Sequence, residues 1–199
     1  MPNKNIDPWF KAEKVAVAAI AAARTAGDWK MLSIEIVNVS EARISRATAA
    51  HNGKRVQIVE NGEGADNIKA AGRYLVQPPL VARDAALLDN ALKSNGTSGV
   101  VACREPVTSL GLCPIVALGS GVTVRVQVEE PKNPNKPTCA WFDHAMKELG
   151  EHVLERLDQD ATQTRQLDYL LAHFSAVPTF LGVYQAAIAI CNTLSHENV

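Results

Sequence analysis

Two histidines and a glutamate in this 199-residue chain have the spacing of a metal site. His144, Glu148 and His152 recur every four residues, so on a helix they would form a column that could bind a divalent metal with a fourth ligand from elsewhere. The chain has no HExxH motif and no Glu-x-x-His pair of the di-iron type. The nearby Glu151 and Glu155 are typical of a solvated acidic face, so we prefer that interpretation and expect no cofactor.

Cysteine offers a second kind of chemistry. Cys103 precedes Arg104, whose positive charge could lower the thiol pKa and create a nucleophile, and Cys113 follows after nine intervening residues. Both lie at the ends of predicted strands, and free cysteine is among the most buried residue types, so core positions are the preferred interpretation. The four cysteines are far apart and include no CxxC pair, which predicts free thiols and a cytoplasmic, not secreted, protein.

A basic hairpin is the third candidate. Asn52-Gly53 is a favoured dipeptide of tight hairpin turns, and we expect residues 43–51 to pair with residues 54–60 around it, although residues 40–51 could instead be helical. The hairpin would carry four cations: Arg43, Arg46, Lys54 and Arg55. Such a ribbon could lie along a phosphate backbone. It contains no interleaved aromatic residues for base stacking, so nucleic-acid binding is an alternative that we do not favour.

Other functional signatures are weaker. Trp141 and Phe142 lie beside a proline-rich segment, where an exposed aromatic pair could anchor a partner protein. The chain has no P-loop, no Rossmann fingerprint, no GxSxG motif, no zinc-finger spacing and no EF-hand loop. Known catalytic motifs therefore give no support for an enzyme.

The first elements of the chain are a helix and a strand. Asp7-Pro8 is a strong helix start and Gly27 a strong stop, which predicts a helix over residues 9–26. This helix is so rich in alanine that we expect it to be buried on more than one side. Residues 31–39 (MLSIEIVNV) alternate apolar and polar side chains and are rich in β-branched residues, which predicts a strand.

The middle of the chain is predicted to be mostly β structure. We expect short helices over residues 66–75 and 80–93. Three strands should follow, over residues 99–103, 114–118 and 122–130. A turn at Gly119-Ser120-Gly121 would join the last two strands. In the last strand four valines alternate with polar residues, the clearest period-two pattern of the chain.

The last third of the chain is predicted to be helical. Residues 131–137 (PKNPNKP) contain three prolines and separate the β-rich middle from helices over residues 140–157, 161–174 and 179–194. The expected class is α+β, with an N-terminal helix, an antiparallel meander and a C-terminal helical hairpin or three-helix unit. We expect the chain to divide into an α+β core domain at 1–130, a linker or arm at 131–139, and a helical subdomain at 140–199 that packs on the core.

Composition and charge argue against several classes of function. The net charge of −1 gives no general attraction to nucleic acid or to anionic membranes. The apolar run 15–23 is too short to span a bilayer, and its acidic neighbours argue against a signal peptide. Residues 1–105 carry 14 basic and 11 acidic side chains, and residues 106–199 carry 6 and 10.

These patterns favour a non-catalytic structural or assembly subunit, such as a virion, tail or scaffold component. Its partners would be copies of itself or other subunits, and the uneven charge suggests a head-to-tail contact. The alternatives are a small enzyme, with a cysteine nucleophile or a His/Glu metal site, and a nucleic-acid-binding protein.

Overall fold

The computed structural model describes residues 8–61 and 70–197, which form six helices and one five-stranded sheet of the α+β class. The helices are α1 (Pro8–Ala26), α2 (Trp29–His51), α4 (Ala82–Ser94), α5 (Cys139–Glu155), α6 (Gln163–His173) and α7 (Leu181–Glu197). The strands are β1 (Val56–Val59), β2 (Gly72–Val76), β3 (Gly99–Arg104), β4 (Leu112–Leu118) and β5 (Thr123–Glu129). Within this part of the chain, no helix combines the length and the apolar character that crossing a membrane requires.

The sheet is mixed, which corrects the prediction of an antiparallel meander. Its strand order is β1-β2-β3-β4-β5, and the first three strands are parallel while β4 and β5 are antiparallel to their neighbours. Parallel neighbours need a crossover connection, and α4 provides it between β2 and β3. The β2 strand is buried along its whole length, as expected for a strand with a parallel neighbour on each side.

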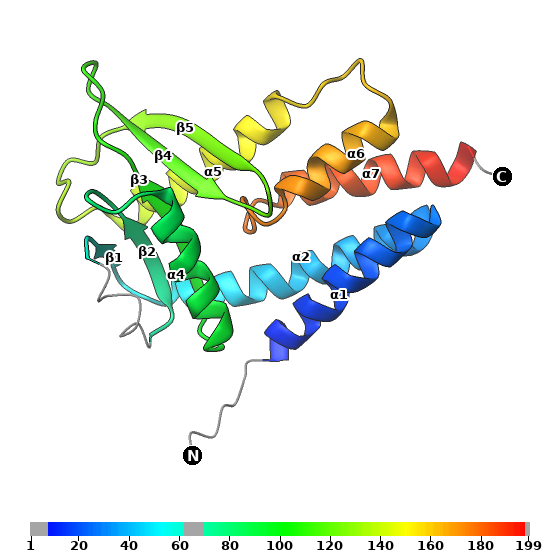
Figure 1. The fold of residues 1–199 in the computed structure, drawn as a ribbon, viewed down its shortest axis with the longest axis horizontal. Coiled ribbons are helices and arrows are strands. Elements are labelled where there is room, and N and C mark those ends of the chain that lie inside the picture. The colour runs from blue at the N-terminus through cyan, green and yellow to red at the C-terminus, as the bar shows by residue number, and fades with distance from the viewer. Residues whose placement is uncertain (1–7, 62–69, 198–199) are drawn as a thin grey trace.

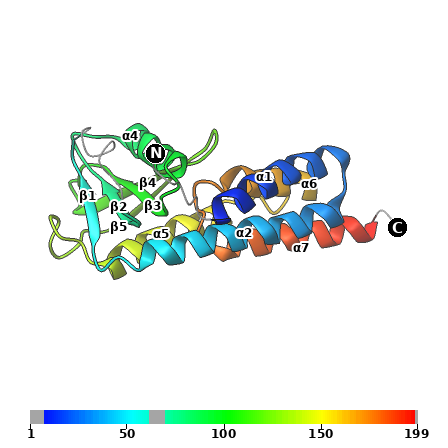
Figure 2. The same cartoon turned by 90° about the horizontal axis from the view of Figure 1, so that it is seen from below.

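Helices cover both faces of the sheet (Figure 2). Helix α4 lies on one face, where Leu88 and Leu92 pack against Tyr74 and Val116. Helices α2 and α5 lie on the other face (Figure 2), and their side chains join a larger core that also includes α7. Helices α1, α2, α6 and α7 continue beyond the sheet and make the molecule elongated (Figure 1).

Residues 31–39 belong to helix α2, so the predicted strand is wrong. Asp28 caps this helix, because its Oδ1 accepts a hydrogen bond from the Met31 amide at 2.9 Å. The buried side chains Leu32, Ile36 and Val39 follow a spacing of four and three residues, which is the period of a helix. The apparent alternation of Leu32, Ile34 and Ile36 is misleading, because Ile34 is exposed.

The predicted hairpin around Asn52 is also wrong. Helix α2 continues to His51 and is C-capped by Asn52, so residues 43–51 are helical. The following strand, β1, pairs with β2 in parallel rather than folding back on residues 43–51. Of the helix predicted over 66–75, residues 66–69 lie outside the described part of the chain, and Gly72–Val76 is a strand.

Several other predictions are confirmed. Helix α4 and strands β3, β4 and β5 lie within a few residues of their predicted bounds, and so do the three C-terminal helices. In β5, Val124 and Val128 are buried while Thr123, Arg125 and Gln127 are exposed, as the alternation predicts.

The proline-rich segment 131–137 contacts its own chain. Its first and last residues, Pro131 and Pro137, are buried. Arg104 of β3 donates a hydrogen bond to the Pro134 carbonyl oxygen at 3.1 Å. Contacts within the chain therefore hold both ends and the middle of this segment.

The inward face of β5 can be tested by substitution. Val124→Asp would bury a carboxylate at a position that is 3 % exposed, and we expect the free energy of unfolding to fall by several kcal/mol, roughly the whole stability of a domain. Thr123→Asp, on the exposed face of the same strand, is the control and should change stability by less than about 1 kcal/mol. Urea denaturation followed by circular dichroism measures both. Equal stability of Val124→Asp and the parent would contradict the assigned face.

Candidate functional site

One carboxylate and two arginines from different helices meet inside the molecule. Glu13 of α1 accepts a hydrogen bond from Arg43 Nε at 2.8 Å on Oε1 and one from Arg46 Nη1 on Oε2. Their side chains are 13 %, 9 % and 7 % exposed, respectively. We call these three residues the Glu13 cluster.

The sequence of α2 places both arginines toward α1. Arg43 and Arg46 are three residues apart, which puts them on one helix face, and they continue the buried stripe that begins with Leu32 and Ile36. The Arg46 guanidinium also lies over the Phe10 ring, with Cζ 4.1 Å from the ring centroid. The long apolar stems of the two arginines thus take the place of core side chains, and their charged ends reach Glu13.

Arg43 connects the cluster to the turn between α6 and α7. Its Nη1 donates to the Phe174 carbonyl oxygen at 2.7 Å and lies 3.2 Å from the Tyr184 hydroxyl. The Tyr184 hydroxyl in turn donates to the Pro178 carbonyl oxygen at 3.1 Å. Arg43 therefore joins α1, α2 and the α6–α7 turn through one guanidinium.

The charges of the cluster keep Glu13 ionised. Burial alone would raise the pKa of the Glu13 carboxyl, but the charges of Arg43 and Arg46 and the hydrogen bond from Arg43 outweigh it, so the pKa lies below the ordinary 4.5. A carboxylate held in this way is a poor general base, because it binds a proton weakly. The cluster is therefore suited to electrostatic attachment rather than to proton transfer.

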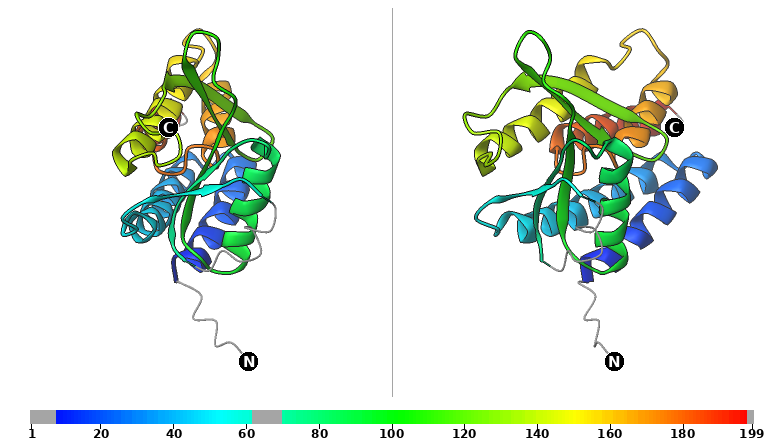
Figure 3. Two further views of the ribbon diagram at one scale, coloured as in Figure 1. Left: turned by 90° about the vertical axis from the view of Figure 1, so that its left-hand side faces the viewer. Right: turned by 60° about the vertical axis from the view of Figure 1, so that its left-hand side comes forward.

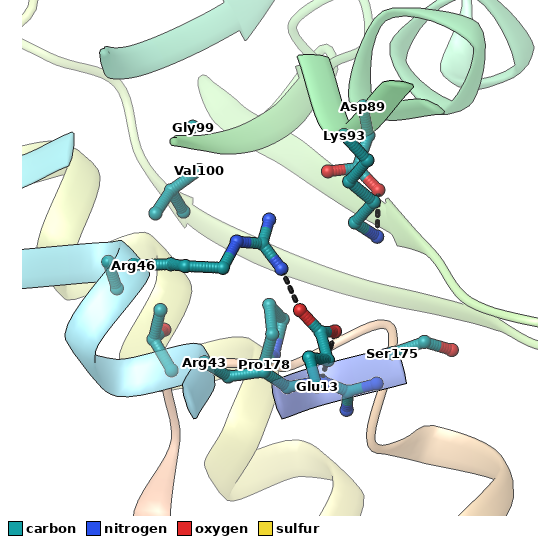
Figure 4. Close-up of a pocket in the computed structure, with 11 residues that line it drawn as sticks. Glu13, Arg43, Arg46, Asp89, Lys93, Gly99, Val100, Ser175 and Pro178 are labelled. Atoms are coloured by element: carbon teal, nitrogen blue, oxygen red, sulfur yellow. Dashed lines mark hydrogen bonds and ion pairs between the residues drawn. The ribbon is translucent and has the colours of Figure 1, made fainter. Parts of the chain in front are cut away.

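A small cavity adjoins the cluster (Figure 4). Its volume is about 20 Å³, and its walls include the cluster, Asp89 and Lys93 of α4, and the start of β3 at Gly99. Side chains of α1 and α4, which are far apart in sequence, line this cavity together, and Figure 3 shows the start of α1 near α4. The cavity has room for about one atom the size of a water oxygen, so no organic substrate fits without movement of the walls.

A second polar site joins α2, β2 and α5. Arg73 of β2 forms two hydrogen bonds with Asp143 of α5, both at 2.8 Å, and donates to the backbone carbonyl oxygens of His51 and Gly53 at 3.1 Å. The His51 ring lies 3.8 Å from the same carboxylate, measured from Nε2 to Oδ1. Burial and the Arg73 charge lower the pKa of His51, although Asp143 acts in the opposite direction.

An open groove of about 370 Å³ lies beside this second site. His51 and Asp143 form its polar side, and Met146, Phe180 and Leu181 form its apolar side. Gly150 permits close packing here, because a Cβ at that position would lie 2.1 Å from the Phe180 ring. Sequence reasoning missed this groove, since its residues come from three distant segments and form no motif.

The predicted cysteine nucleophiles lie in the core. Cys103 and Cys113 are 1 % and 0 % exposed, and burial raises the pKa of each thiol to about 11. For Cys113 the Arg104 charge acts in the lowering direction but does not overcome burial. A raised pKa reduces the thiolate fraction, so this environment does not activate either residue.

The predicted metal column lies on the outer side of α5. His144 Nδ1 is 3.6 Å from Glu148 Oε1, and His152 borders an open acidic groove with Glu148, Glu151 and Glu155. Among the residues that the structure describes, no three His, Cys, Asp or Glu side chains are grouped to hold a metal ion.

The structure separates the remaining candidate binding residues, which are the four basic residues and the aromatic pair. Arg43 and Arg46 are buried in the Glu13 cluster, and Lys54 and Arg55 are exposed in the loop before β1, so the four do not form one basic ribbon. Phe142, predicted as half of an interface pair, is 1 % exposed and belongs to the core. Its neighbour Trp141 is half-buried, and its Nε1 donates to the Glu129 carbonyl oxygen at 2.8 Å.

An apolar groove runs along the outside of α1 and α2. Its volume is about 490 Å³, and its walls come from one side of each helix. The residues that form it are Pro8, Trp9, Lys11, Ala12, Val15 and Ala16 of α1, with Glu35, Asn38, Glu41 and Ala42 of α2. Only one side of α1 faces the core, where Ala16 and Ala23 are buried, so the prediction of burial on more than one side is wrong for the single chain.

No protein-family model, curated protein or solved structure matches this chain.

The Glu13 cluster predicts a pH-dependent loss of stability. Because the pKa of Glu13 is lower in the folded state than the ordinary 4.5, its contribution is complete above pH 4.5 and is lost as the pH falls through the folded value. Glu13→Gln should lower the free energy of unfolding by about 3–5 kcal/mol near neutral pH, since it leaves buried arginines without a carboxylate.

Denaturant unfolding at a series of pH values measures the effect. The difference between Glu13→Gln and the parent should shrink below pH 4.5. Glu130→Gln, at an exposed position directly after β5, is the matched control, and it should change stability by less than about 0.5 kcal/mol. A difference that stays constant with pH would show that Glu13 acts by packing alone.

The thiols should differ in reactivity. Burial raises the pKa of Cys103, Cys113 and Cys191 to about 11, which reduces the thiolate fraction near pH 8 about a hundredfold relative to the ordinary value of 9.0. Cys139, which is only half-buried, should therefore react first with an alkylating reagent in the folded protein. Mass spectrometry of the labelled protein identifies the site, and rapid alkylation of Cys103 or Cys113 would contradict the structure.

Proposed function

We propose that this protein is a non-catalytic assembly subunit that binds a second copy of itself through the outer side of α1 and α2. The observation that carries the proposal is the apolar groove on these helices together with the exposed side chains beside it. We call this surface the α1–α2 face, formed by the groove residues and by Met31 and Ile34.

The α1–α2 face is unusually apolar for a surface. Trp9 is 42 %, Val15 is 60 %, Met31 is 45 % and Ile34 is 49 % exposed. Met31 and Ile34 lie four residues before Glu35 and Asn38, so they extend the α2 wall of the groove by one turn. Large apolar patches with a polar rim are characteristic of protein interfaces.

The dimensions of the face suit a small dimer contact. Helix α1 has 19 residues, which corresponds to about 28 Å, and two helices side by side are about 20 Å wide. A surface of this size is about 560 Å², which is below the roughly 800 Å² per partner of standard-size complexes and corresponds to a small contact between copies.

The charges of the face favour a second copy as the occupant. Its α1 side carries Lys11 and Lys14, and its α2 side carries Glu35 and Glu41; none of the four forms an ion pair within residues 8–61 and 70–197. A two-fold axis would place the basic side of one copy against the acidic side of the other. This isologous contact replaces the head-to-tail contact suggested by the charge of the two halves of the chain.

Alanine makes close helix contact possible. Ala18, Ala21 and Ala22 continue the outer side of α1 and are exposed, so at these three positions only a methyl group separates the α1 backbone from a second helix. The same residues explain why the sequence predicts two-sided burial of α1. In the proposed dimer, the second side would be covered by the other copy.

Sedimentation velocity tests the proposal. The parent should form a dimer or larger species at micromolar concentration, while Val15→Glu and Ile34→Glu should shift it to the 21.4 kDa monomer, because each would bury an unpaired carboxylate in the contact. High salt should weaken the contact in part, since its rim is ionic and its centre apolar.

Leu87→Glu is the matched control. Leu87 is 56 % exposed on α4, away from the groove, so the variant changes the same kind of side chain without touching the α1–α2 face. It should assemble like the parent. A parent that remains monomeric at all concentrations and salt levels would overturn the proposal, and so would equal assembly by Ile34→Glu.

A further inference from the structure

The cavity at the Glu13 cluster carries an excess of positive charge. Three cationic side chains line it, Arg43, Arg46 and Lys93, against two carboxylates, Glu13 and Asp89. Lys93 Nζ lies 2.5 Å from Asp89 Oδ2, so this pair is locally neutral. Among the residues that the structure describes, the two arginines share the single carboxylate of Glu13, so one positive charge there has no counterion.

Arg46 also has an unused hydrogen-bond donor. Its Nε is buried and has no hydrogen-bond partner among the described residues, although the Arg46 side chain is only 7 % exposed. Figure 4 shows the guanidinium between Glu13 and the start of β3, with Lys93 near the same space. A buried donor and a buried unbalanced charge are both costly, and one anion would satisfy both.

We infer that this cavity binds one monoatomic anion of the size of chloride, held by the Arg46 Nε–H and by the excess charge of the two arginines. The volume of about 20 Å³ is enough for one small ligand such as a water molecule or a chloride ion. A water molecule would also fit and would accept the hydrogen bond, but it would leave the charge unbalanced.

The anion would act as a structural ligand. Its position brings together residues of α1, α2, α4 and β3, so it would attach α4 and the start of the central strand β3 to the helical layer. The site lies inside the molecule, whereas the α1–α2 face lies outside, so the inference does not depend on self-association.

Chloride NMR on the full-length protein tests the site. At constant ionic strength, with gluconate as the replacing anion, the parent should show excess chloride line broadening that saturates, and its thermal midpoint should rise with chloride concentration. Arg46→Met should abolish both effects, and it should still fold because it leaves Arg43 and Glu13 as a neutral pair.

Two further variants test whether the charge of the cavity determines chloride binding. Glu13→Gln doubles the excess charge and should tighten chloride binding roughly tenfold or more, wherever enough of it remains folded to measure. Arg24→Gln removes one surface cation of α1 outside the cavity and should bind chloride like the parent. Non-saturating broadening in the parent, or equal broadening in the parent and Arg46→Met, would overturn the inference and assign the cavity to water.

Discussion

The fold depends on one buried carboxylate shared by two arginines. Glu13 attaches α1 to α2, and Arg43 extends that attachment to Tyr184 and to the Phe174 carbonyl oxygen. Burying three charges costs free energy, so a hydrophobic cluster of the same volume could be equally stable. The ion pairs instead fix the orientation of α1 relative to α2. Hydrogen bonds of fixed direction allow one rotation of α1 about its axis, while contacts among its alanines alone would allow several.

That fixed rotation has a consequence for the surface. With Glu13, Ala16 and Ala23 turned toward the core, the groove that includes Val15 is turned outward. The ion pair between Arg24 and Asp168, 2.7 Å from Nε to Oδ1, supports the same rotation at the other end of the helix. The chain thus uses polar contacts to attach α1 from inside and leaves an apolar side outside.

The sequence predicted helix α1 and the elements after residue 80 well, but it predicted the segment between residues 31 and 76 poorly. The pattern of β5 could be predicted because apolar residues of this strand point to the core and polar residues point to solvent, in strict alternation. In α2, the helical period was hidden because two of its buried positions hold Arg43 and Arg46. Those arginines are stable inside only because Glu13 lies opposite them, about thirty residues earlier in the sequence.

The candidate sites were harder to predict for the same reason. Short-range motifs identified Cys103 and His144, which the structure places in the core and on an exposed helix side. The Glu13 cluster and the groove beside His51 consist of residues from distant segments, which a single sequence does not bring together. The alanine-rich sequence of α1 predicted burial on more than one side, which the single chain does not show.

Concentration-dependent amide hydrogen exchange tests the central claim most directly, because it reports the contact surface residue by residue. If the α1–α2 face joins two copies, exchange in α1 and in the first half of α2 should slow as protein concentration rises, while exchange in α4 and β5 should not change. Exchange that is independent of concentration throughout, or protection that appears only outside the α1–α2 face, would contradict the account.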